Sequence, residues 1–149
     1  MAISLTTLIR KYTPGGRRAF TNQDPVNLNA VANGTRLTVV RVVEQPEEVT
    51  QITLVKFGAA PSSAGGTITI AIANRDVSAG ATDNLLAAAT FDLETLSANA
   101  ESAALTLTAT LGDRQLEVGD FIVTTIVSNN ADAAALDGLA IRVQTTPMA

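Results

Sequence analysis

The side chains able to carry chemistry are mainly carboxylates, amides, hydroxyls and a few cations, because the 149 residues include no His, Cys or Trp. Thiolate and imidazole ligands for zinc, copper or iron–sulfur clusters are therefore excluded. Catalysis by Ser-His-Asp or Cys-His groups is excluded with them. Disulfide bonds cannot form either, so stability must come from packing or assembly. Carboxylates are the only catalytic groups left to consider.

Two groups of acids could in principle act as paired carboxylates. Glu44, Glu47 and Glu48 lie between two predicted strands. Asp92 and Glu94 lie together at the end of another. A glycosidase needs two carboxylates flanking a sugar cleft, and with one Tyr and four Phe the chain supplies few aromatic side chains to line it. We interpret these acids as solvated turn residues and predict that the protein is not an enzyme.

A calcium site is the remaining metal hypothesis. Asn130, Asp132 and Asp137 could offer oxygen ligands, but their spacing does not match an EF-hand loop. Asp137-Gly138 is more economically a turn before a strand. No phosphate-binding loop is present, since Gly65-Gly66 precedes a predicted strand rather than a helix. We expect no metal and no cofactor.

Charge is divided unevenly along the chain. Residues 1–41 hold six basic residues and one acid, a net charge of plus 5, whereas residues 42–149 hold four basic residues and 13 acids, a net charge of minus 9. Such asymmetry indicates that the basic end has an electrostatic partner of its own. Nucleic acid is disfavoured as that partner because the acidic remainder would repel a polyanion. An acidic protein surface suits the basic end better.

The chain divides at about residue 34. Residues 1–34 contain Pro14-Gly15-Gly16 and several Asn and Asp turn signals, which predict an extended N-terminal arm with at most one short helix or strand near residues 3–11. The charges of the first 12 residues follow the apolar stretch, the reverse of a secretory signal. No apolar run is long enough to cross a bilayer. We therefore expect no membrane partner.

Residues 35–149 are predicted to form a β-sandwich domain. About seven segments carry the period-two alternation of strands, and Gly, Pro, Asn and Asp separate them. They are residues 35–43, 49–57, 67–73, 85–93, 104–111, 121–128 and 139–145, of which 85–93 could instead begin a helix. This arrangement favours an all-β fold built as an antiparallel sandwich.

Three of these segments carry further predictions. Residues 35–43 are apolar on both faces, which is typical of a central or doubly covered strand. Residues 67–73 should direct Ile68, Ile70 and Ile72 inward. At Gly119-Asp120, glycine can take a positive φ while Asp bonds the turn backbone, so we predict a structural corner rather than a ligand site.

The chain resembles the decoration, or cement, proteins of tailed-bacteriophage capsids. The resemblance rests on a body rich in Ala and Thr, on an N-terminal arm, and on the L-x-V-G-D-x-I turn at residues 116–122. It implies a jelly-roll-like sandwich and a homotrimer on the outer surface of an icosahedral virion. There it would clamp neighbouring major capsid proteins after synthesis in the host cytoplasm.

The arm supplies the candidate capsid contacts. These are the basic residues and the two aromatic residues beside them: Arg10, Lys11, Tyr12, Arg17, Arg18 and Phe20. Three copies acting together would strengthen such contacts through multivalency. An alternative hypothesis is a trimeric tail-fibre or adhesin-type module that binds a host receptor, which should expose an aromatic or loop-rich end.

Overall fold

The computed structural model describes residues 18–21, 33–131 and 138–148, with only the backbone for 18–21, 130 and 131. More than half of these residues lie in strands. The elements are β1 (Arg18–Thr21), β2 (Gly34–Val42), β3 (Glu47–Lys56), β4 (Ser63–Asp76), β5 (Ala81–Asn84), β6 (Phe91–Asp92), the 3-10 helix η1 (Leu93–Thr95), β7 (Ala100–Glu101), the one-turn helix α2 (Leu111–Arg114), β8 (Gln115–Leu116), β9 (Phe121–Ala131) and β10 (Leu139–Pro147).

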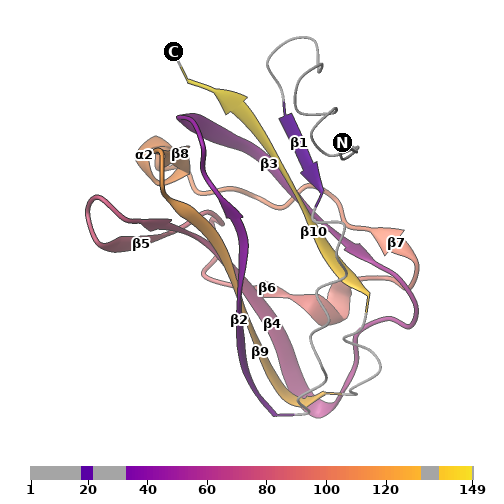
Figure 1. Cartoon of the computed structure of the whole chain (residues 1–149). Coiled ribbons are helices and arrows are strands. Elements are labelled where there is room, and N and C mark those ends of the chain that lie inside the picture. Colours follow the sequence, from indigo (N-terminus) through magenta and orange to yellow (C-terminus); the bar gives the residue numbers. More distant parts are fainter. Residues whose placement is uncertain (1–17, 22–32, 132–137, 149) are drawn as a thin grey trace, which may run out of the picture.

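The strands form two facing sheets (Figure 1). Sheet A has the order β1-β10-β3, and the short strands β7 and β8 both pair with β3. Sheet B has the order β2-β9-β4, and β5 and β6 both pair with β4. All pairs are antiparallel. Since the first strand pairs with the last and the second with the last but one, the chain has the nested order of a jelly roll. The predicted antiparallel sandwich is confirmed.

The core lies between the sheets and consists of alternate residues of each long strand. On β4, Ile68, Ile70 and Ile72 are buried as predicted. Ile52 and Leu54 of β3 belong to the same cluster. Burying each such side chain stabilises the fold by about 1.5 to 3 kcal/mol. Period-two alternation therefore places the core correctly along the long strands.

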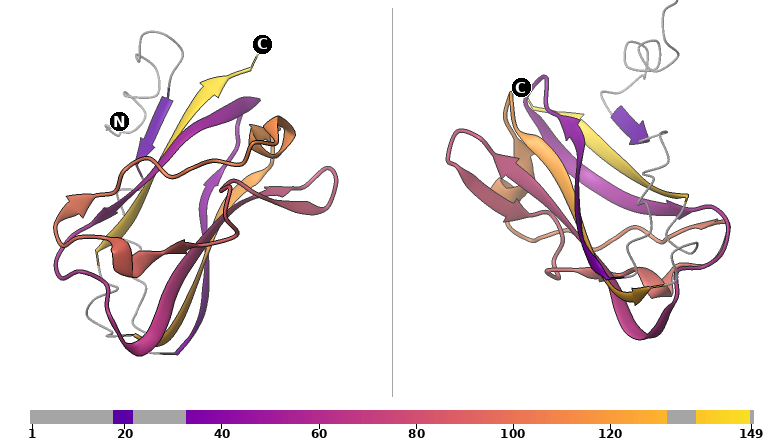
Figure 2. Two further views of the ribbon diagram at one scale, coloured as in Figure 1. Left: turned by 180° about the vertical axis from the view of Figure 1, so that it is seen from behind. Right: turned by 60° about the horizontal axis from the view of Figure 1, so that its bottom comes forward.

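Two predicted strands are wrong in whole or in part. Residues 104–111 form no strand, and only Leu107 makes an isolated bridge, to Leu86. The reason is that this segment bonds to both layers: the N–H of Leu105 donates to β3, at Ile52, while Thr108 bonds to Leu85, next to sheet B. The segment crosses the open side of the sandwich instead of joining one sheet (Figure 2). Within 85–93 only Phe91–Asp92 forms a strand, and residues 87–89 are an exposed loop.

The Gly119-Asp120 corner is confirmed. Gly119 has a φ of 97°, and the buried Asp120 carboxylate accepts hydrogen bonds from the backbone N–H groups of Glu117, at 2.9 Å, and Val77, at 3.1 Å. The corner also bonds to Val43, whose N–H donates to the Asp120 carbonyl at 2.8 Å. This single carboxylate thus ties the turn before β9 to the turn after β4.

Part of the predicted arm belongs to the sandwich. Arg18–Thr21 forms the edge strand β1, with Arg18 opposite Thr145 and Thr21 opposite Arg142 of β10. The rest of residues 1–32, including the predicted helix or strand near residues 3–11, lies outside the described residues. Strand β2 begins at Gly34, next to the predicted start of the body at residue 35.

Candidate interaction surfaces

The acids near Pro46 lie in three different environments. Glu47 was predicted to be solvated, and this is wrong: it is completely buried against Arg41 of β2, with Arg41 Nη2 2.8 Å from Glu47 Oε1. Thr145 of β10 also donates to Glu47 Oε2, at 2.9 Å. Glu48 is half-buried and lies 3.5 Å from Arg114, whereas Glu44 is exposed. Glu47 therefore joins strands of both sheets.

Asp92 and Glu94 likewise have structural contacts. The Asp92 carboxylate caps η1 by accepting from the N–H of Glu94, at 2.9 Å. The Glu94 carboxylate accepts from both the N–H and the hydroxyl of Ser63 at the start of β4. Elsewhere, backbone donation from Ala79 and the hydroxyl of Ser78 lower the pKa of Asp76 from its ordinary value. Each of these three carboxylates therefore binds a backbone N–H group at the end of a strand or in a turn.

Within the described ranges, no three acidic side chains lie close enough together to hold a metal ion. The side chains of Asn130, Asp132 and Asp137, the candidate calcium ligands, lie outside what the structure describes. Gly138 sits in a turn with a φ of 72°, in agreement with the predicted turn before β10.

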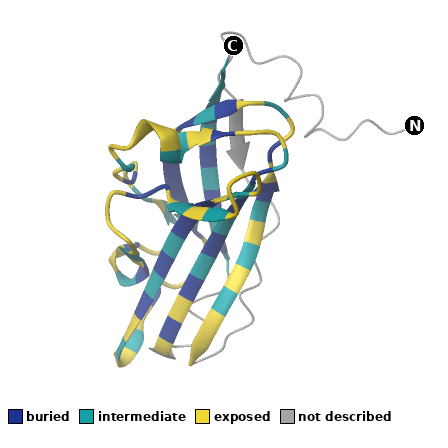
Figure 3. Cartoon of the chain, turned by 90° about the vertical axis from the view of Figure 1, so that its left-hand side faces the viewer, coloured by how far each residue is buried: buried dark blue, intermediate teal, exposed yellow. Residues whose placement is uncertain are grey.

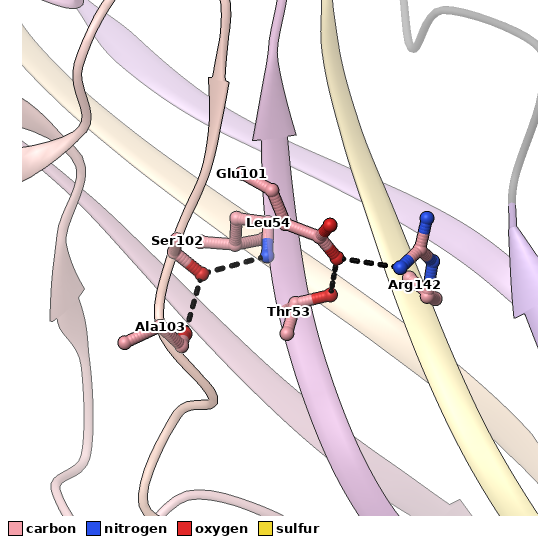
Figure 4. Close-up of polar contacts among 6 residues, drawn as sticks. All are labelled: Thr53, Leu54, Glu101, Ser102, Ala103 and Arg142. Carbon is pink, nitrogen blue, oxygen red and sulfur yellow. Dashed lines mark hydrogen bonds and ion pairs between the residues drawn. The ribbon is translucent and has the colours of Figure 1, made fainter.

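Glu101 is the centre of a polar cluster on the outer side of sheet A (Figure 4). Its Oε1 accepts from Thr53 of β3, at 2.6 Å, and from Nη1 of Arg142 of β10, at 2.8 Å. Beside it, the hydroxyl of Ser102 accepts from the N–H of Leu54, at 3.0 Å. The cluster fastens the β7 segment across two strands.

A cavity of about 550 Å³ adjoins this cluster, between residues 86–91 and 95–106. Its lining is mainly Ala, Leu, Ser and Thr, and Glu101 is the one ionisable residue among the described residues that line it. That carboxylate is bound to Arg142 and Thr53, so its charge is engaged in contacts within the fold.

The two sheets present different outer faces. The outer face of sheet A is polar and includes the Glu101–Arg142 pair. The outer face of sheet B, defined by register and alternation, comprises Thr35, Leu37, Val39, Val42, Phe121, Val123, Thr125, Val127, Asn129, Thr67, Thr69, Ala71, Ala73 and Arg75, bordered by Asp92, Thr82 and Asn84. Along β2 and β9 it carries no charged residue.

Strand β2 does not have the position predicted for it. It is an edge strand of sheet B in the described part of the chain, and its outward residues are uncovered (Figure 3). The exposed fractions are 65% for Leu37, 51% for Val39 and 49% for Val42, and Val127 on β9 is 44% exposed. A group of large apolar side chains on one flat face is typical of a protein contact. Sequence patterning detected their hydrophobicity but not their exposure.

The predicted capsid contacts can be placed only in part. Arg10, Lys11, Tyr12 and Arg17 lie outside the described residues. The backbones of Arg18 and Phe20 belong to β1, opposite Thr145 and Val143. The structure therefore joins the basic segment to the edge of sheet A.

Comparisons with known proteins identify no family model, curated protein or solved structure that matches this chain. In the portion that the structure describes, no helix has the length and apolar character needed to cross a membrane.

Proposed function

We propose that the chain is a structural virion protein that binds the outer surface of an icosahedral phage capsid and clamps neighbouring major capsid proteins. In this proposal the basic N-terminal segment contacts the capsid, and the acidic sandwich faces solvent. Support comes from the sequence resemblance, the jelly-roll order and the opposite charges of the two regions.

The observation that carries the proposal is the attachment of the basic segment. The residues that follow Arg17 form β1, which is hydrogen-bonded along β10 as the edge of sheet A. A contact made by the preceding segment would therefore be held by a sheet rather than by a free linker. Strand β10 in turn pairs with β3 over nine residues of β10, so a load on β1 would be shared by the whole sheet.

The charges of the sandwich support the same division of roles. Its buried or bonded acids serve the fold: Glu47 binds Arg41, Glu101 binds Arg142 and Asp120 holds a corner. Glu44, Glu117 and Asp92 remain exposed, so the sandwich would repel an acidic capsid surface. The basic segment is the part of the chain suited to that contact.

The structure sets where the arm can be removed. Deleting residues 1–17 leaves β1 intact, whereas a deletion to residue 20 would remove three of its four residues. We expect the truncated chain to fold and to lose binding to capsids lacking this protein, measured by co-sedimentation. R10E/K11E/R17E should lose binding likewise, while the matched change R10K/R17K should retain it. Undiminished occupancy by either the truncated chain or the charge-reversed variant would overturn the proposal.

A receptor-binding module is the second candidate. One observation favours it: Phe57, directly after β3, is 65% exposed beside the loop at residues 58–62. An exposed aromatic ring at a loop-rich end suits recognition of a host surface. If this candidate is correct, Phe57→Ala should abolish binding to host cells and leave capsid binding unchanged. If the capsid proposal is correct, the chain should not bind host cells on its own.

A further inference from the structure

The outer face of sheet B is a grid whose rows are fixed by strand register. In order along the strands, the outward rows are Asn129-Thr67, Thr35-Val127-Thr69-Asp92, Leu37-Thr125-Ala71, Val39-Val123-Ala73-Asn84 and Val42-Phe121-Arg75-Thr82. The Leu37 and Val39 rows contain only Leu, Val, Thr, Ala and Asn. Charge occurs only in the Thr35 and Val42 rows, on either side of these two, and only on the β4 side of the grid.

Those two charges have opposite signs. Asp92 lies beside Thr69 in the Thr35 row, and Arg75 lies in the Val42 row. Arg75 follows Thr69 by six positions along β4, about 20 Å at the usual rise of a strand. Asp92 is exposed, and Arg75 is exposed with its Nη1 2.6 Å from the hydroxyl of Thr82. The face is therefore charged at two separated points, one positive and one negative.

We propose that two copies of this chain associate through the outer face of sheet B about a two-fold axis that runs across the strands. Such an axis reverses the order of rows and keeps each strand over its counterpart. Leu37 of one copy then meets the Val39 row of the other. Asp92 of each copy meets the row that holds Arg75 and Thr82 of the other. The contact has an apolar centre and an ion pair at each end.

A second copy fits this face better than an unlike partner does. Residues 42–149 have a net charge of minus 9, so two such bodies repel each other in most orientations. The outer face of sheet B brings them together without opposing acids, because reversal of the rows sets each Asp92 against an Arg75. The complementary surface for this pattern of charges is thus the same face on another copy.

Contact by the face is also favoured over pairing along the free edge of β2. Arg36 shares the inward side of β2 with Thr38, and the register shifts between Val39 and Arg41. Inward-pointing charges and bulges are features by which edge strands avoid pairing with other chains. The apolar residues instead point outward from the sheet, where only a face-to-face contact can bury them.

The size of the face sets the expected strength. Four rows about 6.8 Å apart on three or four strands about 4.8 Å apart give roughly 500 Å² on each copy. The two copies together would bury about 1,000 Å², which is close to the smallest total area of a specific interface. We therefore expect a concentration-dependent dimer, not an obligate one. This two-fold contact differs from the homotrimer implied by the sequence resemblance, and it does not depend on capsid binding.

The test is the mass of the full chain in solution, without capsids, by sedimentation equilibrium over micromolar to millimolar concentrations. We expect the 15.4 kDa monomer to give way to a species of twice that mass. Leu37→Asp should weaken association at least tenfold, and Leu37→Thr, which suits an exposed strand, should weaken it with the fold retained. Arg142→Gln, which lowers the net charge by the same one unit as Leu37→Asp but lies on sheet A, should leave the dimer unchanged. A monomer throughout, a trimer, or a dimer indifferent to both Leu37 variants would overturn the inference.

A charge exchange tests the two-fold axis itself. Arg75→Asp alone and Asp92→Arg alone should each weaken self-association, because both ion pairs then oppose like charges. Mixing the two variants should restore a dimer of one copy of each, since both of its pairs again join unlike charges. Circular dichroism of each variant controls for loss of the Asp92 cap. If the folded variants do not recover association on mixing, the proposed axis is wrong.

Discussion

Arg41 and Glu47 form an ion pair that joins the two sheets inside the core. Arg41 is on β2 of sheet B and Glu47 begins β3 of sheet A, with Nη2 2.8 Å from Oε1 and side chains 5% and 0% exposed. Removing one member of a buried pair leaves the other charge in a medium of low polarity. We expect Glu47→Gln to lower the free energy of unfolding by about 3 kcal/mol, measured by urea denaturation. Glu48→Gln is the matched control and should cost less than about 1 kcal/mol. Equal losses of stability in Glu47→Gln and Glu48→Gln would contradict the claim that burial makes the Arg41–Glu47 pair the more important of the two.

The Arg142–Glu101 pair has the same 2.8 Å separation but side chains 36% and 38% exposed. Solvent screens such a pair, and exposed pairs contribute about 0.2 to 1 kcal/mol. Arg142→Met should therefore reduce stability by less than about 1 kcal/mol in the same denaturation experiment. A loss as large as that for Glu47→Gln would show that the Glu101 cluster supports the fold more strongly than its exposure indicates.

Asp120 should be the most sensitive acid outside the Arg41–Glu47 pair. Asp120→Ala removes the acceptor for the N–H groups of Glu117 and Val77. Hydrogen bonds to a charged group contribute about 1.5 to 3 kcal/mol each, so losing these two part-buried bonds should cost about 2 kcal/mol or more. Asp113→Ala, which removes a single 3.3 Å contact with Thr108, is the control. A thermal melt that ranks Asp113→Ala as the more damaging change would contradict the assignment.

Two glycines should respond to alanine in opposite directions. Gly138 has a φ of 72°, and an added Cβ would lie 2.8 Å from the carbonyl oxygen of Phe57. Gly112 has open space around it within the short helix α2. Gly138→Ala should destabilise the fold by more than 1 kcal/mol, whereas Gly112→Ala should be neutral or stabilise it by up to about 1 kcal/mol. Melting temperatures of the two variants decide this, and a stabilised Gly138→Ala would refute the close contact.

Alternation in the sequence predicted the long strands because their side chains alternate between core and surface. Residues 67–73 show this most clearly, with Ile68, Ile70 and Ile72 in the core. The same alternation failed at residues 104–111. There Leu105 is buried, but the backbone bonds change partner from β3 to the segment beside sheet B within three residues. Side-chain periodicity reports burial and does not report where the backbone hydrogen bonds go.

The surfaces were less predictable because they depend on which strand lies next to which. Glu47 lies next to another acid in sequence, so its burial could not be inferred without its partner Arg41 on a separate strand. Leu37 and Val39 alternate as in a covered strand, and only the strand order reveals that β2 is an edge. The charge division was visible in the sequence, but the pairing of Arg18–Thr21 with β10 was not.

Binding to capsids tests the central claim most directly. Purified full-length chain would be titrated onto icosahedral capsids that lack it, and the copies bound per capsid counted after sedimentation. The proposed function predicts saturation at a fixed number of copies that follows the symmetry of the capsid, together with greater resistance of the capsid to heat. A chain that stays in the supernatant at every concentration, or that binds without saturating, would contradict it.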